Sequence, residues 1–168
     1  MTGDAAWYEA AFVVGITNAL NVVADGLEAA LPPPDPAALA PEGLALLAEI
    51  RTFYACAEAP VPFRVLARDP AYAADVWAAT RRAFEDARLA RRLKEALAFA
   101  VSLTTRSAFG VPFHLGEMRR LGVGEPGVME IVGVTQMFSS YTKIADTLRL
   151  EPDMGDVAPE DPTPAPGA

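Results

Sequence analysis

One glutamate and one histidine stand out in this chain because their side chains could perform acid–base chemistry together. His114 is the only histidine in the sequence, and histidine is the side chain whose charge changes near neutral pH. A carboxylate that faces an imidazole orients the ring and favours its charged form. If Glu95 meets His114 across a pair of helices, the two residues predict a general acid–base pair.

Each of these two residues also has an interpretation without chemistry. Glu95 follows Arg91 by four residues, the spacing of an ion pair on a solvated helix face. A lone histidine among apolar neighbours such as Phe113 and Leu115 is often a half-buried side chain with no catalytic role. The residues alone leave both interpretations open.

Ser107 and Gly110 lie between this pair and complete the pattern Glu-x11-Ser-x2-Gly-x3-His. The pattern resembles Glu-x11-Cys-x2-Cys-x3-His, the peroxidase motif of the alkylhydroperoxidase D (AhpD)-like, carboxymuconolactone decarboxylase family. In that family one thiolate attacks the peroxide and the other resolves the sulfenic acid to a disulfide. Serine cannot be oxidised in such a cycle, and glycine has no side chain. The resemblance therefore predicts the family's fold and pocket without its redox chemistry.

The resemblance extends over residues 62–153 through short segments in a fixed order. They are the Arg68-Asp69-Pro70 helix start, Lys94-Glu95-Ala96-Leu97-Ala98, Met118-Arg119-Arg120-Leu121-Gly122-Val123 and Ile144-Ala145-Asp146-Thr147-Leu148. Membership implies a compact all-helical fold around a helical hairpin. It also implies a homo-oligomer (trimer, hexamer or dimer) with the pocket near subunit contacts.

Other residues near the motif are candidates for the walls of a small-molecule site. Arg106 could bind a carboxylate through its planar fork, although it could equally be a surface arginine. Phe109, Gly110 and Phe113 are expected beside the ligand, and Phe138 in the core or the pocket wall. Ser107 is expected to cap a helix or donate a hydrogen bond to a ligand.

A hydrolase triad of Ser107, His114 and Glu95 has the correct residue types but lacks the Gly-x-Ser-x-Gly turn that exposes a nucleophile. The decarboxylase branch of the family transfers protons without the cysteine pair, so the resemblance favours a lyase, isomerase or decarboxylase-like proton transfer. A non-catalytic binding or assembly protein on the same fold is the alternative. A thiol-dependent hydroperoxide reductase would have to rely on Cys56, the only cysteine.

The apolar periodicity is helical almost throughout and predicts an all-α fold of about six helices. Asp4 begins a first helix with Trp7, Val14 and Val22 on its apolar side, and helices are expected to begin at Pro41, Asp69-Pro70 and Glu125-Pro126. Residues 1–150 are expected to form one domain, in which residues 1–31 form the N-terminal helix, residues 32–40 form a proline-rich spacer and residues 62–150 form the family core. Residues 151–168, rich in proline and acids, are expected to be a disordered tail.

The net charge and the residue composition disfavour several classes of binding partner and cofactor. The net charge is −8, which disfavours nucleic acid and anionic membrane surfaces as partners. No segment is expected to span a bilayer, so a cytoplasmic location is the default expectation. One cysteine and one histidine cannot supply a zinc site, and no phosphate-binding glycine loop is present, so neither a metal nor a cofactor is expected.

Overall fold

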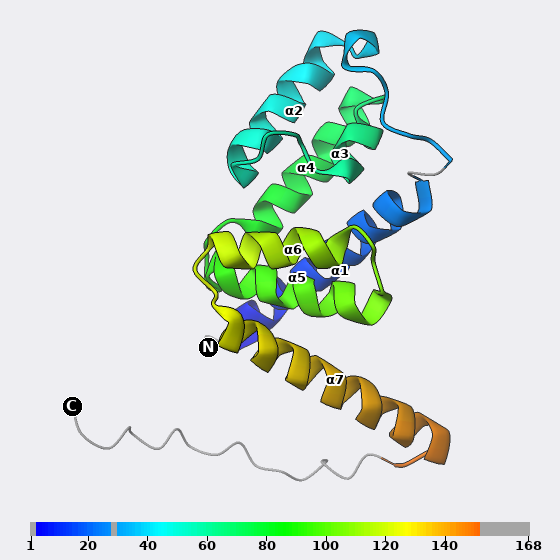
Figure 1. The fold of residues 1–168 in the computed structure, drawn as a ribbon, viewed down its shortest axis with the longest axis vertical. Coiled ribbons are helices and arrows are strands. Elements are labelled where there is room, and N and C mark those ends of the chain that lie inside the picture. Colours follow the sequence, from blue (N-terminus) through cyan, green and yellow to red (C-terminus); the bar gives the residue numbers. More distant parts are fainter. Residues whose placement is uncertain (1–2, 28–29, 152–168) are drawn as a thin grey trace, which may run out of the picture.

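The computed structural model describes residues 3–27 and 30–151, and within them the chain is helical without any strand (Figure 1). The elements in chain order are α1 (Gly3–Leu27), the 3-10 helix η1 (Pro36–Ala38), α2 (Pro41–Tyr54), α3 (Val61–Leu66), α4 (Pro70–Phe84), α5 (Arg91–Thr105), α6 (Gly110–Arg120) and α7 (Glu125–Leu148). The all-α prediction is confirmed.

Several helix boundaries follow local chemistry that is visible in the sequence. The side chain of Asp69 accepts a hydrogen bond from the Tyr72 amide at 3.1 Å, and Pro70 is the first residue of α4. Proline also occupies the first turn of α2 and of α7. The chain leaves α6 through Gly122, whose φ of +86° is the left-handed conformation that favours glycine. These starts and stops agree with the sequence predictions.

One helix more was found than the sequence indicated. No helix start was expected between Pro41 and Asp69, but Pro60 is the N-cap of α3, and Pro62 lies in its first turn. Proline is compatible with the first turn because the amide groups there have no partner within the helix. The prolines of this segment are compatible both with an interruption of the chain and with the start of a helix, so the sequence alone does not distinguish the two.

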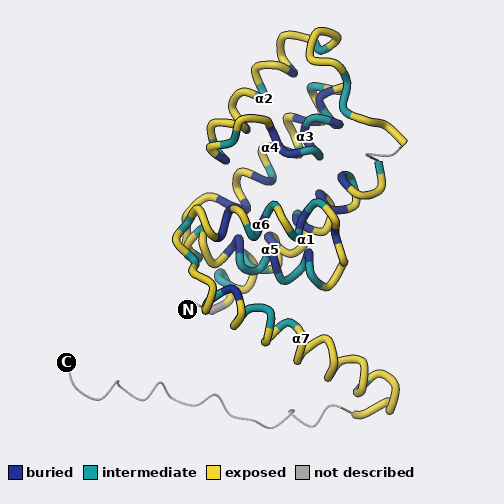
Figure 2. The backbone as a smooth tube through the Cα atoms, viewed as in Figure 1, coloured by how far each residue is buried: buried dark blue, intermediate teal, exposed yellow. Residues whose placement is uncertain are grey.

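The hairpin of α5 and α6 forms the centre of the molecule, and the other helices are arranged around it (Figure 1). Helix α1 packs against α5 and also contacts α3 and α4. Helices α2 and α3 lie at one end, joined to the hairpin by the long α4. Helix α7 contacts α5 with its first turns and then extends past the hairpin, where most of its residues are exposed (Figure 2).

The buried face of α1 differs from the one that the sequence suggested. Trp7, Val14 and Val22 are exposed. The buried residues of α1 are Val13, Thr17, Leu20, Asn21 and Ala24. Because apolar residues surround this helix, periodicity alone does not single out one face, and two buried polar side chains mark the true contact with α5 and α6.

Helix α1 also corrects the expectation that no segment is long and apolar enough to cross a bilayer. The stretch Asp4–Leu27 passes that test by length and composition, with a mean hydropathy of 1.5. A core helix of a soluble protein and a signal sequence pass the same test. In this structure α1 packs against α3, α4 and α5, and the cytoplasmic location stays a prediction.

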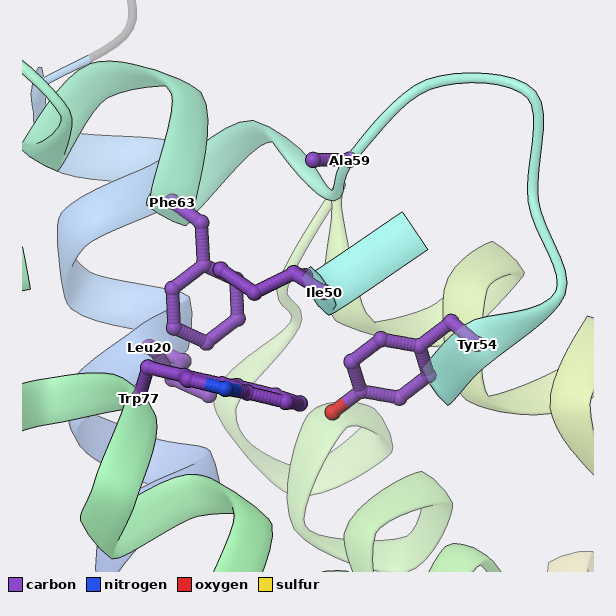
Figure 3. Packing of buried hydrophobic residues seen from close by; sticks show 6 residues of the cluster. All are labelled: Leu20, Ile50, Tyr54, Ala59, Phe63 and Trp77. Atoms are coloured by element: carbon purple, nitrogen blue, oxygen red, sulfur yellow. The ribbon is translucent and has the colours of Figure 1, made fainter. Parts of the chain in front are cut away.

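An aromatic cluster joins α2, α3 and α4 to α1 (Figure 3). The Trp77 ring meets Phe63 edge-on, with centroids 5.5 Å apart, and its Nε1 donates to Glu49 at 2.8 Å. Leu20 and Ile50 complete the cluster. Packing of this kind, with the indole donor of Trp77 satisfied, stabilises the end of the molecule that α2, α3 and α4 form. The predicted tail lies, apart from residue 151, outside the described residues.

A buried ion pair fastens α1 to the start of α5. The Lys94 side chain is fully buried, and its Nζ donates to Glu9 Oε1 at 2.9 Å and to the Glu85 carbonyl at 2.5 Å. The second Glu9 oxygen accepts the Leu89 amide at 2.8 Å. The hydrogen bond from Lys94 holds the pKa of Glu9 below its ordinary value.

Glu9→Gln is expected to reduce the free energy of unfolding at neutral pH by about 3 kcal/mol, because Lys94 would remain buried without its counter-charge. A carboxyl with a depressed pKa stabilises the fold above its unfolded pKa of about 4.3, and this contribution is lost as the pH falls through the folded value. Urea unfolding at several pH values should therefore show the difference between the two proteins shrinking in acid. A difference that does not change with pH would contradict this role.

Candidate functional site

Glu95 and His114 meet inside the hairpin. Glu95 lies in α5 and His114 in α6, and the His114 Nδ1 is 2.8 Å from Glu95 Oε2. Both side chains are buried, with 0% and 2% of the residue exposed. Because an ionised carboxylate only accepts hydrogen bonds, a neutral His114 would carry its proton on Nδ1, which leaves Nε2 with a free lone pair.

Aromatic rings hold the imidazole on two sides. Phe84 of α4 stacks on it with centroids 5.8 Å apart and planes 12° apart. Phe113 of α6 meets it edge-on at 5.1 Å. The ring therefore has little freedom to rotate away from Glu95, and the contact is pre-organised.

A chain of alternating charges continues from Glu95 along the hairpin. Arg91 Nη2 donates to Glu117 Oε2 at 2.8 Å, and Arg120 binds both Glu117 oxygens, at 2.8 and 2.6 Å. The Arg91 Nε lies 3.6 Å from Glu95 Oε1. Each buried carboxylate thus faces at least one guanidinium, as burial of charge requires.

The Arg91–Glu95 contact is longer than a hydrogen bond. Arg91 Nε and Glu95 Oε1 are both buried, and neither has a hydrogen-bond partner among the described residues. One oxygen of Glu95 is therefore engaged by His114, whereas the other remains free to accept a proton or a donor group.

Helix α2 covers this network with two aromatic rings. The Arg91 guanidinium lies 4.1 Å from the centroid of the Phe53 ring and 5.3 Å from that of Tyr54, and its Nη1 donates to the Phe53 carbonyl at 3.2 Å. Burial, and next the charge of Glu95, hold the pKa of Tyr54 well above its ordinary value. Tyr54 is therefore a neutral phenol at physiological pH.

The sequence did not single out Arg91, Glu117 or Tyr54 as site residues. Arg91 had been noticed only as the ion-pair partner of a solvated Glu95. The i,i+3 spacing of His114 with Glu117, and of Glu117 with Arg120, was the available signal, since it places the three side chains along one face of α6. Which face of α6 is buried became visible only in the fold.

The Ser107 side chain binds a backbone amide at the start of α6. Its Oγ accepts the Gly110 amide at 2.7 Å, although the N-cap residue of α6 is Phe109, which makes no side-chain cap. Within the described residues no hydrogen bond joins Ser107 to His114, so the hydrolase triad is not assembled.

Gly110 lies against α1 with no room for a side chain. A Cβ at this position would come within 2.3 Å of both Asn21 Oδ1 and Ser102 Oγ. Asn21 is held there because its Nδ2 donates to Ser102 Oγ at 3.1 Å and to Thr105 Oγ1 at 3.3 Å. Asn21 of α1 and Ser102 of α5 therefore fill the space that the second cysteine of the family motif would need.

The remaining candidates are dispersed. Phe109 stacks on Phe113 with centroids 5.1 Å apart, and of these two rings it is Phe113 that meets the His114 ring. Arg106 is exposed and ends α5 in the left-handed conformation, with φ of +57°. Phe138, expected in the core or the pocket wall, is 65% exposed on α7, because the helix extends beyond the hairpin at that point.

No group of three or more His, Cys, Asp or Glu side chains that could hold a metal ion occurs in residues 3–27 and 30–151. The polar atoms around His114 come instead from paired carboxylates and guanidiniums. The arrangement supports proton transfer and charge stabilisation by the side chains themselves.

Comparisons with known proteins give one match. The family model described as carboxymuconolactone decarboxylase family matches residues 70–150, which span α4 to α7 and include Glu95, Ser107, Gly110 and His114. No curated protein and no solved structure matches the chain. Helices α1, α2 and α3 precede the matched segment.

Gly110→Ala is expected to lower the free energy of unfolding by about 2 kcal/mol, because the methyl group would overlap two buried polar atoms. Gly116→Ala in the same helix is the matched control, since a Cβ there meets nothing within 4 Å and alanine favours a helix by up to about 1 kcal/mol. Denaturant unfolding of both variants measures the difference. Equal stability of the two variants would contradict this prediction, because it would show that Asn21 and Ser102 can move aside at little cost in free energy.

Proposed function

We propose that this chain, whose residues 70–150 belong to the carboxymuconolactone decarboxylase family, transfers protons on a small organic acid at Glu95 and His114. The observation that carries the proposal is the buried carboxylate–imidazole contact of 2.8 Å. The class of reaction is that of a lyase, isomerase or decarboxylase, in which a proton is taken from one atom of the substrate or given to another.

In this proposal the Nε2 of His114 takes the substrate proton. The resulting imidazolium is stabilised by Glu95, while Arg91 limits the build-up of negative charge around the carboxylate. Return of the same proton to a different carbon gives an isomer. If the proton taken is that of the substrate's carboxylic acid, the carboxylate then loses carbon dioxide, and the imidazolium returns the proton to the carbanion to give the decarboxylated product.

Because Glu95 and His114 are buried, a substrate can reach them only if neighbouring side chains move. Phe113, half-buried against His114, and Phe109, half-buried and stacked on Phe113, are the side chains that a ligand would displace or contact. Arg106 precedes Phe109 by three residues and is suited to bind the carboxylate of the incoming acid.

The environment of Cys56 argues against a thiol peroxidase. Burial, and next the charge of Glu117, raise the pKa of the Cys56 thiol, whereas a peroxide-reducing cysteine needs a lowered pKa. Cys56 lies in the segment between α2 and α3 rather than in the hairpin.

One observation favours a second candidate, a non-catalytic binding or assembly protein. The charge network is largely buried, with Arg120 its most exposed member, and it ties α2, α5 and α6 together through Phe53, Arg91 and Glu117. In that case Glu95 would serve to hold His114 and Arg91 in the core, and its removal would affect stability alone.

Proton transfer is tested by incubating the protein in deuterium oxide with a panel of lactone acids, β-keto acids and unsaturated acids, followed by proton NMR. We expect deuterium incorporation or carbon dioxide release that falls at least about 100-fold in Glu95→Gln and in His114→Asn. Glu125→Gln is the control, because Glu125 is exposed and pairs only with Arg119.

A nitrogen-15 spectrum of the single histidine reports the pair independently of substrate. The Nδ1–H form is expected for the neutral ring in the wild type, and loss of that preference is expected in Glu95→Leu. If a substrate is turned over at full rate by folded Glu95→Gln and His114→Asn proteins, the site does not transfer protons. If the variants lose only stability and no acid reacts, the assembly role is favoured.

We further propose that a second copy of the chain covers the exposed stripe of α7. Its members are Val134, Met137, Tyr141, Ile144 and Leu148, all exposed. They recur at alternating intervals of three and four residues, the spacing of a coiled-coil seam. A helix with such a stripe is marginal without a partner.

Sedimentation analysis should find the wild type as a homo-oligomer and Ile144→Lys shifted to smaller species, because a charge in the seam cannot be buried. Thr142→Lys, on the same helix but outside the stripe, should sediment as the wild type does. A monomeric wild type, or equal effects of both substitutions, would refute the proposed interface.

A further inference from the structure

A groove of about 670 Å³ lies between the proline-rich segment, α2 and the start of α3. This volume is in the range of small-molecule sites. None of its lining residues belongs to the network around Glu95 and His114. Helix α2 separates the two regions, since it turns Phe53 and Tyr54 toward the network and Leu44, Leu47 and Arg51 toward the groove.

The walls of the groove are mainly apolar and are held in place. Pro33 and Pro36 form one side, and Leu44 and Leu47 form the other. The proline-rich side is fixed because Arg68 Nη2 donates to the Pro32 carbonyl at 2.5 Å. Proline rings also restrict the backbone, so little ordering is needed when a ligand binds.

The charges of the lining leave one cation without a partner. Arg64 Nη1 pairs with Glu58 at 2.9 Å. Asp35 accepts the Ala37 amide at 2.9 Å and so caps η1. The Arg51 guanidinium has neither an ion pair nor a hydrogen bond within the described residues, although it lies beside the apolar walls. The lining holds two arginines and two carboxylates, and a negatively charged head group on a ligand would give Arg51 the partner that Arg64 has in Glu58.

We propose that this groove binds a monoanionic amphiphile, with its apolar body between the prolines and leucines and its anionic head at Arg51. A planar guanidinium binds a carboxylate or a phosphate through two parallel hydrogen bonds. The ligand is therefore defined as an acyl or aryl chain that ends in one such group. This site is independent of the proton-transfer site and would exist whether or not the latter is catalytic.

Titration calorimetry with decanoate, decanol and decyltrimethylammonium, each below its micelle concentration, tests the charge requirement. We expect decanoate to bind more tightly than the other two, and Arg51→Gln to weaken decanoate about tenfold while decanol is unaffected. Arg82→Gln, which removes an exposed arginine of α4 outside the groove, should bind decanoate as the wild type does. Methyl decyl phosphate, a phosphodiester with a single negative charge, separates the two possible heads, since the tighter of the two anions identifies the group that Arg51 prefers.

The location is tested by methyl NMR and by a second variant. Decanoate should shift the methyl signals of Leu44 and Leu47 but not those of Ile144, and Leu44→Ser should weaken both decanoate and decanol. The proposal fails if Arg51→Gln binds decanoate unchanged, if the cationic amphiphile binds as tightly, or if the shifts centre on α7, which would mean non-specific binding to its exposed stripe.

Discussion

Compensation of buried charge in the α5–α6 hairpin is the constraint on which the rest of the structure depends. The hairpin buries a glutamate and a histidine in contact and places Arg91 and Glu117 beside them. Glu117 faces Arg91 of the neighbouring helix, and Glu95 faces both Arg91 of its own helix and the His114 imidazole of the neighbouring one, so each carboxylate is tolerated. The register of the two helices is consequently specified, since a shift along the axis would leave a carboxylate opposite a carboxylate. Helix α2 can then seal the network with the flat faces of Phe53 and Tyr54.

The matched family segment does not enclose this network alone. Helix α2 supplies the rings over Arg91, and α1 supplies Asn21 beside Gly110 and Glu9 beside Lys94. All three contributions come from residues that precede the segment 70–150. The N-terminal helices are therefore part of the enclosure of the site, and a fragment restricted to α4–α7 would expose Lys94 and Arg91 to solvent.

Much of the fold could be predicted from the sequence because helix boundaries depend on neighbouring residues. Asp69, Pro70 and Gly122 act through their own backbone and side chains, so their effects are visible locally. The pairing of Glu95 with His114 was accessible only through their spacing and the family resemblance. The true face of α1 and the roles of Arg91 and Glu117 were not predictable, because they depend on which helix packs opposite. Periodicity identifies an apolar side but carries no information on its neighbour, and in α1 it pointed to the wrong side.

The close approach of Asn21 to Gly110 has a consequence for the history of the chain. A residue with a Cβ at position 110 is compatible with this packing only if both Asn21 of α1 and Ser102 of α5 move or become smaller, because an atom of each lies 2.3 Å from where that Cβ would be. Positions 21, 102 and 110 are thus epistatic, and a redox-active cysteine pair could not return here by changes in the motif alone. Helices α1 and α5 together make the absence of the second thiol difficult to reverse.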